Sequence, residues 1–314
     1  MQIKKWMLIV AVLLPLMMAD ASRTPRWAVG TGNMLETADD DDFDMPVKQE
    51  ETLRQEYPLA ATGDRVLDVD NVWGSIDVVG TAGNQVQVVI RKTIRAESQA
   101  AMDKAKKEVT LQAMRDDNSV RLYVDGPFRC HERNNNGDGC CCNWREHDGY
   151  VVKMDFQIQV PNKIRLALKT VNDGNIKVQG VTGDFSIRNV NGRIDVQDAA
   201  GSGRVKTVNG GVKVTFRANP TTNSEFTTIN GPVELYFADR LSADFRFKTF
   251  NGEIYSDYEL SLMPARQPEQ QRSGNKFVFR ADRYTNGRVG SGGPEIKIEN
   301  LNGDIRVLQR HAAL

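Results

Sequence analysis

The chain has 314 residues, of which 40% are hydrophobic and 26% are charged, a composition ordinary for a folded globular protein. Its 41 Lys and Arg residues balance 41 Asp and Glu residues, so the sequence lacks the net positive charge typical of nucleic-acid-binding proteins. Three His residues disfavour a histidine-rich metalloenzyme. The length predicts about two domains of ordinary size, or one larger all-β or repeat unit.

The first 21 residues have the pattern of a secretory signal peptide. Lys4 and Lys5 precede an apolar run from Trp6 to Met18, and Ala19-Asp20-Ala21 supplies the small residues of a cleavage site. The run is shorter than the roughly 20 residues of a membrane-spanning helix, although an uncleaved N-terminal anchor is the alternative. We therefore predict cleavage before Ser22, no transmembrane span, and an exported protein that is periplasmic, on the cell surface or secreted.

Residues 22–59 are expected to form an acidic disordered linker. Asp39-Asp40-Asp41-Asp42 and Asp44 stand among few apolar residues, and like charges at this density oppose packing. A calcium site is the alternative, but the spacing matches no known calcium loop.

Residues 60–162 are expected to form an N-terminal β region with one short helix and a cysteine-rich loop. Val86, Val88 and Ile90 alternate as in a strand, and Val120–Val124 and Val151–Val160 also predict strands. The segment from Ser98 to Lys107 mixes apolar and charged residues at the spacing of a short amphipathic helix.

Residues 163–314 contain a repeat, which is the strongest signal in the chain. Each copy has alternating apolar residues, then Thr or Asn, one apolar residue, Asn and Gly, and alternating apolar residues again. In the first copy Asp173 stands as one extra residue between Asn172 and Gly174. The Asn before the turn is Asn172, Asn191, Asn209, Asn230, Asn251 and Asn302, and an outlying copy at 67–78 has Trp73 in that place. The turn glycines at 174, 192, 210, 231 and 252 are 18, 18, 21 and 21 residues apart, which predicts a repeat architecture.

Two folds fit this repeat. Asn-Gly between alternating strands is a hairpin signal, which alone predicts an antiparallel meander or sandwich. The apolar residue that follows the Thr or Asn breaks the alternation, and a corner whose neighbouring residues both face the interior would explain it. Stacked coils would then align the six asparagines as a structural ladder. We predict an all-β, parallel β-solenoid or β-helix-like fold with about 18–21 residues per coil. The insertion at 256–293 is expected to cover its C-terminal end.

One cluster of side chains has the chemistry of a site. It comprises Cys130, His131, Cys140, Cys141, Cys142 and His147. Thiolates and imidazoles suit zinc or a copper-like ion. In an oxidising compartment the same cysteines form disulfides, with three pairings available to four Cys. The spacing matches no standard zinc module, which favours disulfides over metal; reactive or incidental thiols are a third alternative.

The sequence carries no catalytic motif of the Gly-x-Ser-x-Gly or His-Glu-x-x-His type. Carboxylates such as Asp195, Glu234 and Glu253 could in principle form a glycosidase pair. Their place beside Lys177 and Lys213 favours a solvated face of cross-strand ion pairs instead. We predict no enzymatic activity, no cofactor and no nucleic-acid partner, with a polysaccharide-active β-helix enzyme as the alternative.

The segment Leu-Asp-Val-Asp-Asn-Val-Trp-Gly-Ser-Ile-Asp-Val at 67–78, the Val-Asn-Gly repeats, and Gly290-Ser291-Gly292-Gly293 resemble the bacterial DUF4097 family of adhesin-like proteins. The resemblance covers roughly residues 60–310 and rests on structural motifs. It implies an exported β-solenoid-like envelope protein, a scaffold that binds an envelope protein or a glycan. The family has no catalytic motif to transfer. The cysteine-rich loop departs from its pattern, which keeps a metal- or redox-responsive envelope protein as an alternative.

Overall fold

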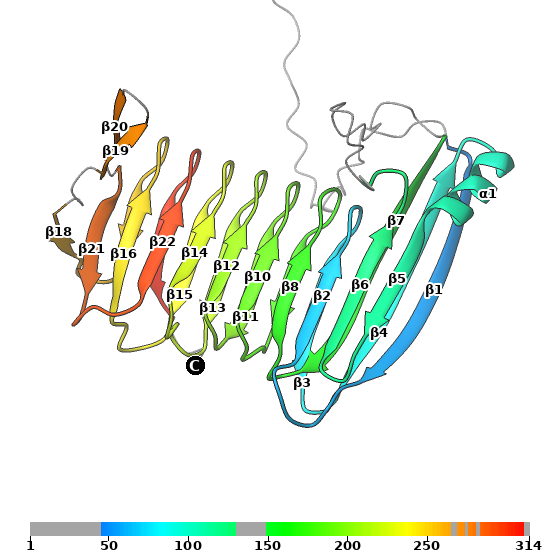
Figure 1. Ribbon diagram of the computed structural model, residues 1–314, viewed down its shortest axis with the longest axis horizontal. Helices are drawn as coiled ribbons and strands as arrows, with labels where there is room; N and C mark the ends of the chain where they lie inside the picture. The colour runs from blue at the N-terminus through cyan, green and yellow to red at the C-terminus, as the bar shows by residue number, and fades with distance from the viewer. Residues whose placement is uncertain (1–44, 130–148, 265–268, 274–275, 281–282, 311–314) are drawn as a thin grey trace, which may run out of the picture. The chain divides into compact units, whose positions relative to one another are not determined.

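The computed structural model describes residues 45–129, 149–264, 269–273, 276–280 and 283–310. These residues belong to one compact unit, Phe43–Leu314. They form two large mixed sheets, one two-stranded sheet and a single short helix, which confirms the all-β class with one helix in the N-terminal half (Figure 1). No helix in the described part of the chain is both long and apolar enough to cross a membrane.

The ten-stranded sheet is called sheet A. In spatial order it contains β1 (Val47–Pro58), β4 (Gln85–Ala96), β7 (Tyr150–Pro161), β3 (Ile76–Thr81), β9 (Ile176–Gln179), β11 (Ile194–Ala199), β13 (Val212–Phe216), β15 (Val233–Phe237), β23 (Ile305–Gln309) and β17 (Ile254–Ser256).

The eleven-stranded sheet is called sheet B. In spatial order it contains β18 (Ser261–Met263), β21 (Thr285–Val289), β16 (Ala243–Lys248), β22 (Glu295–Glu299), β14 (Ser224–Thr227), β12 (Gly203–Lys206), β10 (Phe185–Arg188), β8 (Arg165–Lys169), β2 (Val66–Asp70), β6 (Ser119–Asp125) and β5 (Thr110–Arg115). A separate hairpin pairs β19 (Glu269–Ser273) with β20 (Lys276–Arg280).

Each copy of the repeat contributes one strand to each sheet. Strand β8 of sheet B runs into the Asn172 turn, and β9 of sheet A follows it. Successive copies pair in parallel and in register, as β8–β10–β12–β14 in one sheet and β9–β11–β13–β15 in the other. The two strands on either side of an Asn-Gly turn therefore lie in different sheets. The turns are corners between sheets, and the antiparallel meander does not describe this part of the chain.

Antiparallel pairs occur toward both ends of the sheets. They are β1–β4, β4–β7 and β5–β6 at one end, and β16–β21 and β18–β21 at the other. The copies of the repeat pair with one another in parallel, as predicted, and each antiparallel pair includes at least one strand outside the repeat. Strands that reverse direction satisfy the backbone groups of the outermost parallel strands, which would otherwise be open edges.

The order of the coils in space differs from their order in the sequence at both ends. The coil β2–β3 comes first in the sequence, but it pairs with β6–β7 on one side and β8–β9 on the other. The coil β22–β23 comes last, yet it pairs with β14–β15 and β16–β17. Figure 1 shows this red strand β22 between β14 and β16. The insertion thus covers β16 in sheet B through β21, and the last copy in the sequence is internal.

The side chains between the two sheets form one hydrophobic core. Val, Ile and Leu fill most inward positions of the coils, and Phe residues take over toward the C-terminal coils. There Phe216 stacks on Phe237 with ring centroids 5.1 Å apart, and Phe237 meets Phe245 edge to face at 5.8 Å. Because each coil exposes its apolar rows above and below, only stacking with a neighbour buries them.

Two predicted boundaries are wrong. Residues 47–58 were expected in the disordered linker, but they form β1, whose Leu53 and Tyr57 pack against the core. Glu50 and Glu56 illustrate why the strand was hard to predict: its exposed charges hide the weak alternation, and such charges protect an edge strand from pairing with other chains. The boundary at 162 is also absent, because strands from both sides of it share both sheets. The predicted signal peptide and acidic run lie outside the described residues.

The single helix α1 (Gln99–Glu108) begins at the predicted place, where the hydroxyl of Ser98 accepts a hydrogen bond from the backbone N–H of Ala101. At its C-terminal end the buried Lys92 donates from Nζ to the carbonyl of Val109 at 2.8 Å. Burial lowers the pKa of Lys92, since it penalises the charged ammonium.

Removing residues 294–314 should test the internal position of the last coil. β17 loses its pairing partner β23, and β16 loses β22 on one side. Four apolar side chains that contribute about 1.5–3 kcal/mol each are lost with them. We expect the amides of β16 and β17 to lose protection from hydrogen exchange, while those of β8–β11 keep it. Full protection of β16 in the truncated chain would contradict this coil order.

Candidate binding faces

The asparagines of the repeat lie in one row along the corners. From the second asparagine of the row onward, each side-chain amide donates from Nδ2 to Oδ1 of the preceding asparagine, at 2.7–2.8 Å. The order along the row is Asn172, Asn191, Asn209, Asn230, Asn302 and Asn251. The row is solvent-exposed, and the place of Asn302 follows the internal position of the last coil. Each bond joins two coils, so the row ties the corners together.

A second set of hydrogen bonds lies beneath this row, from the Thr or Asn two residues earlier in each copy. Thr207 is fully buried and donates from Oγ1 to the carbonyl of Gly192, at 3.0 Å. Thr228 does the same to the carbonyl of Gly210 at 2.8 Å. The equivalent donors in other coils are Thr170, Asn189, Thr249 and Asn300. Asn71 differs, because it donates to the carbonyl of Met154 in the neighbouring coil and to that of Gly74 in its own turn. The polar residue in phase with the apolar face therefore satisfies a turn carbonyl of a neighbouring coil.

The glycine of the turn is required by both conformation and space. Gly210 has φ 147°, and a Cβ there would lie 2.4 Å from the carbonyl oxygen of Gly192. Any side chain would push the corners apart and lengthen the hydrogen bonds that join them.

In the six corners that carry an asparagine of the row, the apolar residue does not face the interior, contrary to the prediction; Val72 in the outlying copy is buried. Exposure increases along the row, from half-buried Val171, Val190 and Val208 to Ile229 at 37%, Leu301 at 44% and Phe250 at 79%. A corner turns one residue outward between the buried Thr and the exposed Asn. This break in the alternation therefore marks an outward-facing position.

The row of asparagines ends at Trp73, which bridges to Asn172. The strands of the next coil, β6 and β7, are joined by residues 126–149, of which the structure describes 126–129 and 149. Trp73 meets Phe128 of that connection edge to face, with centroids 5.5 Å apart. Beside it, Arg129 pairs with Asp70 at 2.9 Å. Among the described residues, the side-chain contact at this end of the row is therefore aromatic, where the other corners have an amide contact.

All six residues of the predicted cysteine and histidine cluster lie outside the described residues. They are Cys130, His131, Cys140, Cys141, Cys142 and His147. Their role in disulfides or in metal binding stays a prediction.

The outward face of sheet A carries an in-register row of alternating charge. Along neighbouring strands it consists of Asp77, Lys177, Asp195, Lys213, Glu234 and Arg306. Arg306 pairs with Glu234 at 3.3 Å. Opposite charges on adjacent strands stabilise each other. Asp195 and Glu234 are two strands apart with Lys213 between them, an arrangement that separates these carboxylates.

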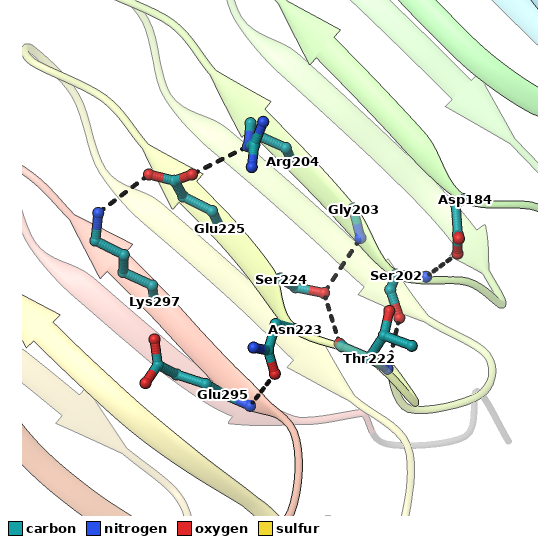
Figure 2. Close-up of a pocket in the computed structure, with 10 residues that line it drawn as sticks. All are labelled: Asp184, Ser202, Gly203, Arg204, Thr222, Asn223, Ser224, Glu225, Glu295 and Lys297. Carbon is teal, nitrogen blue, oxygen red and sulfur yellow. Dashed lines mark hydrogen bonds and ion pairs between the residues drawn. The ribbon is translucent and has the colours of Figure 1, made fainter.

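The outward face of sheet B contains a shallow depression of about 310 Å³ at the starts of β10, β12, β14 and β22 (Figure 2). Most of its polar groups are already bound to a neighbouring coil. Asp184 accepts the backbone N–H of Ser202 at 2.9 Å, the hydroxyl of Ser224 accepts that of Gly203, and Asn223 accepts that of Glu295. These side chains fasten one coil to the next, as the asparagines do at the other corner.

The carboxylates beside the depression are held in an ion-paired cluster. Glu225 accepts from Arg204 at 3.0 Å and from Lys297 at 3.2 Å, as Figure 2 shows. Lys297 also pairs with Glu299 at 3.2 Å, and the hydroxyl of Tyr284 donates to Glu299. Burial alone would raise the pKa of Glu299, but the hydrogen bonds from Tyr284 and Lys297 outweigh it and lower this pKa. A carboxylate held in its charged form is suited to pairing and poorly suited to donating a proton.

The two faces therefore offer flat rows of charged side chains. Among the described residues, no group of three His, Cys, Asp or Glu side chains could hold a metal ion. Tyr255 is exposed on β17, while Tyr258 packs against the core.

No family model and no curated protein matches the chain, so the similarity to the DUF4097 family stays a resemblance. Three solved structures are similar. A "putative cell adhesion protein" from Clostridium sporogenes has 11% identity and TM-score 0.35, covering 83% of this chain and all of its own. A "putative adhesin" from Bacteroides fragilis has 13% identity and TM-score 0.36, covering 83% and 97%. A "putative lipid binding protein" from Parabacteroides distasonis has 9% identity and TM-score 0.22, covering 83% and 97%.

Asn209→Asp tests the amide row. The new carboxylate cannot donate to Oδ1 of Asn191 and places negative charge against it, so we expect a loss of about 1–2 kcal/mol in unfolding free energy at pH 7. Near pH 3.5 the protonated carboxyl can donate, and the loss should shrink. Chemical denaturation of the variant and the wild type at both pH values measures this loss in unfolding free energy.

The matched control is Asn175→Asp. The Oδ1 of Asn175 accepts from the backbone N–H of Arg193, and a carboxylate keeps that bond. We expect the control to retain stability at pH 7. An equal loss in both variants would show that the row contributes nothing particular.

Glu299→Gln tests the cluster on sheet B. Because the pKa of Glu299 is lowered on folding, its stabilisation is present above the ordinary value of 4.5 and is lost as the pH falls through the lowered value. We expect the variant to be about 1 kcal/mol less stable at pH 7 and nearly equal to the wild type in strong acid. The exposed Glu259→Gln is the control, and a pH-independent loss in Glu299→Gln would refute the assignment.

Proposed function

We propose that this protein is an exported, non-catalytic β-solenoid scaffold that binds an envelope protein or a glycan on its flat sheet faces. The observation that carries the proposal is the in-register stacking of coils across both sheets. Equivalent positions of successive coils form continuous rows, and such rows make an extended surface suited to a long or repeating partner.

The arrangement of the acidic side chains supports a binding role over a catalytic one. A glycosidase needs two carboxyl groups on either side of one bond, one of them protonated at working pH. Here Glu225 is held between Arg204 and Lys297, and Asp184 is bound to the backbone of the next coil. Both carboxylates therefore form hydrogen bonds that join neighbouring coils.

Export is supported by the sequence. The positive N-terminus, the short apolar run and Ala19-Asp20-Ala21 are the pattern of a cleaved signal peptide. An oxidising compartment would also suit the predicted disulfides of the cysteine loop.

The mature chain, residues 22–314, should bind without turnover. We expect saturable binding to at least one member of a glycan array, or to one purified envelope protein, with the ligand recovered at unchanged length. Release of shortened products, at a rate that Glu225→Gln or Asp184→Asn abolishes, would contradict a non-catalytic scaffold and revive the polysaccharide-active alternative.

A further inference from the structure

A row of like charges crosses the outward face of sheet B. Lys169 on β8, Arg188 on β10 and Lys206 on β12 are in register with one another, and all three are exposed. Neighbouring strands lie about 4.8 Å apart, so the three cations follow one another at that interval.

Little acidic charge compensates this row. The outward side chains of β8, β10 and β12 are Arg165, Ala167, Lys169, Ser186, Arg188, Arg204 and Lys206, which are five cations and no acid. Lys169 pairs with Asp70 at 3.4 Å on one side of the row. Within the described part of the chain, Arg188 and Lys206 make no ion pair.

The opposite face of the same coils is built differently. On β9, β11 and β13 the equivalent row reads Lys177, Asp195 and Lys213, so that an acid separates the two cations. Like charges directly opposite each other on adjacent strands are destabilising. The row on sheet B is therefore destabilised by repulsion between neighbouring cations, which the acid between the cations prevents on sheet A. An anionic ligand bound to the row would relieve this repulsion.

We propose that the row Lys169–Arg188–Lys206 binds a linear acidic polysaccharide laid across strands β8, β10 and β12. This inference rests on the proposed function and names the class of its glycan. The row runs across the strands, and Ala167 and Ser186 beside it leave the cations accessible from that side. A chain with a carboxylate on every sugar places its charges at regular intervals, which fits a row of evenly spaced cations.

A membrane fits this surface less well. Interfacial binding to lipid combines basic residues with apolar side chains that enter the bilayer. The outward positions of β8, β10 and β12 offer only Ala167 as an apolar side chain. Nucleic acid carries comparable charge density, and it serves below as a competing ligand.

The test measures binding of the mature chain to polygalacturonate, to its fully methyl-esterified form, to anionic lipid vesicles and to single-stranded DNA. We expect polygalacturonate to bind, with affinity falling about tenfold or more between 50 and 500 mM NaCl because salt screens exposed charges. The esterified polymer, which keeps the sugar chain and loses the charge, should not bind. The triple variant Lys169→Gln, Arg188→Gln, Lys206→Gln should lose at least tenfold in affinity and keep or gain thermal stability.

The control is Lys177→Gln, Arg193→Gln, Lys213→Gln, which removes the same charge from the sheet A side of the same coils. It should bind polygalacturonate as the wild type does. Equal losses in both triple variants, or tighter binding to vesicles or to DNA than to polygalacturonate, would overturn the inference. Binding to a neutral glycan or to a protein alone would also overturn it while leaving the proposed function intact. Failure to bind any partner would count against both.

Discussion

The fold depends on how the chain passes from one sheet to the other. At each corner the backbone must turn sharply, and its polar groups need partners in the next coil. Backbone groups of the next coil supply some of these partners, and the buried Thr or Asn side chains bind the glycine carbonyls. The exposed asparagine amides bond to one another and join corner to corner. The glycine allows the corners to approach closely enough for both sets of side-chain hydrogen bonds. The motif Thr-apolar-Asn-Gly therefore provides the side-chain hydrogen bonds and the sharp turn of one corner.

Much of this could be read from the sequence because the corner is local. The period, the two strands per copy, the helix and the position of the six asparagines follow from residues within one repeat. The order of the coils could not be read, since Asn302 fits beside Asn230 as well as Asn251 does, and identical corners carry no information on their neighbours. Trp73 marked the other end of the row, because it has an aromatic side chain at the position of the asparagine.

Other parts were mispredicted for physical reasons that apply beyond this chain. The apolar residue of the corner was expected to face the interior because it breaks the alternation, yet Phe250 is largely exposed because the turn points it outward. Strand β1 was assigned to the linker because its exposed charges resemble those of a disordered segment, although its partner β4 holds it along its whole length. The basic row on sheet B escaped notice because its three members are 18 or 19 residues apart in sequence and meet only when the coils stack in register.

The position of Asn302 is the most direct test of how the coils stack. Nuclear Overhauser contacts between side-chain amides, measured on protein labelled only at asparagine, would report it. Hydrogen bonding at 2.7–2.8 Å predicts contacts from Asn302 to both Asn230 and Asn251, and none between Asn230 and Asn251. Direct contacts between Asn230 and Asn251, or isolated signals from every corner, would contradict a continuous row of amides and the stacked coils that depend on it.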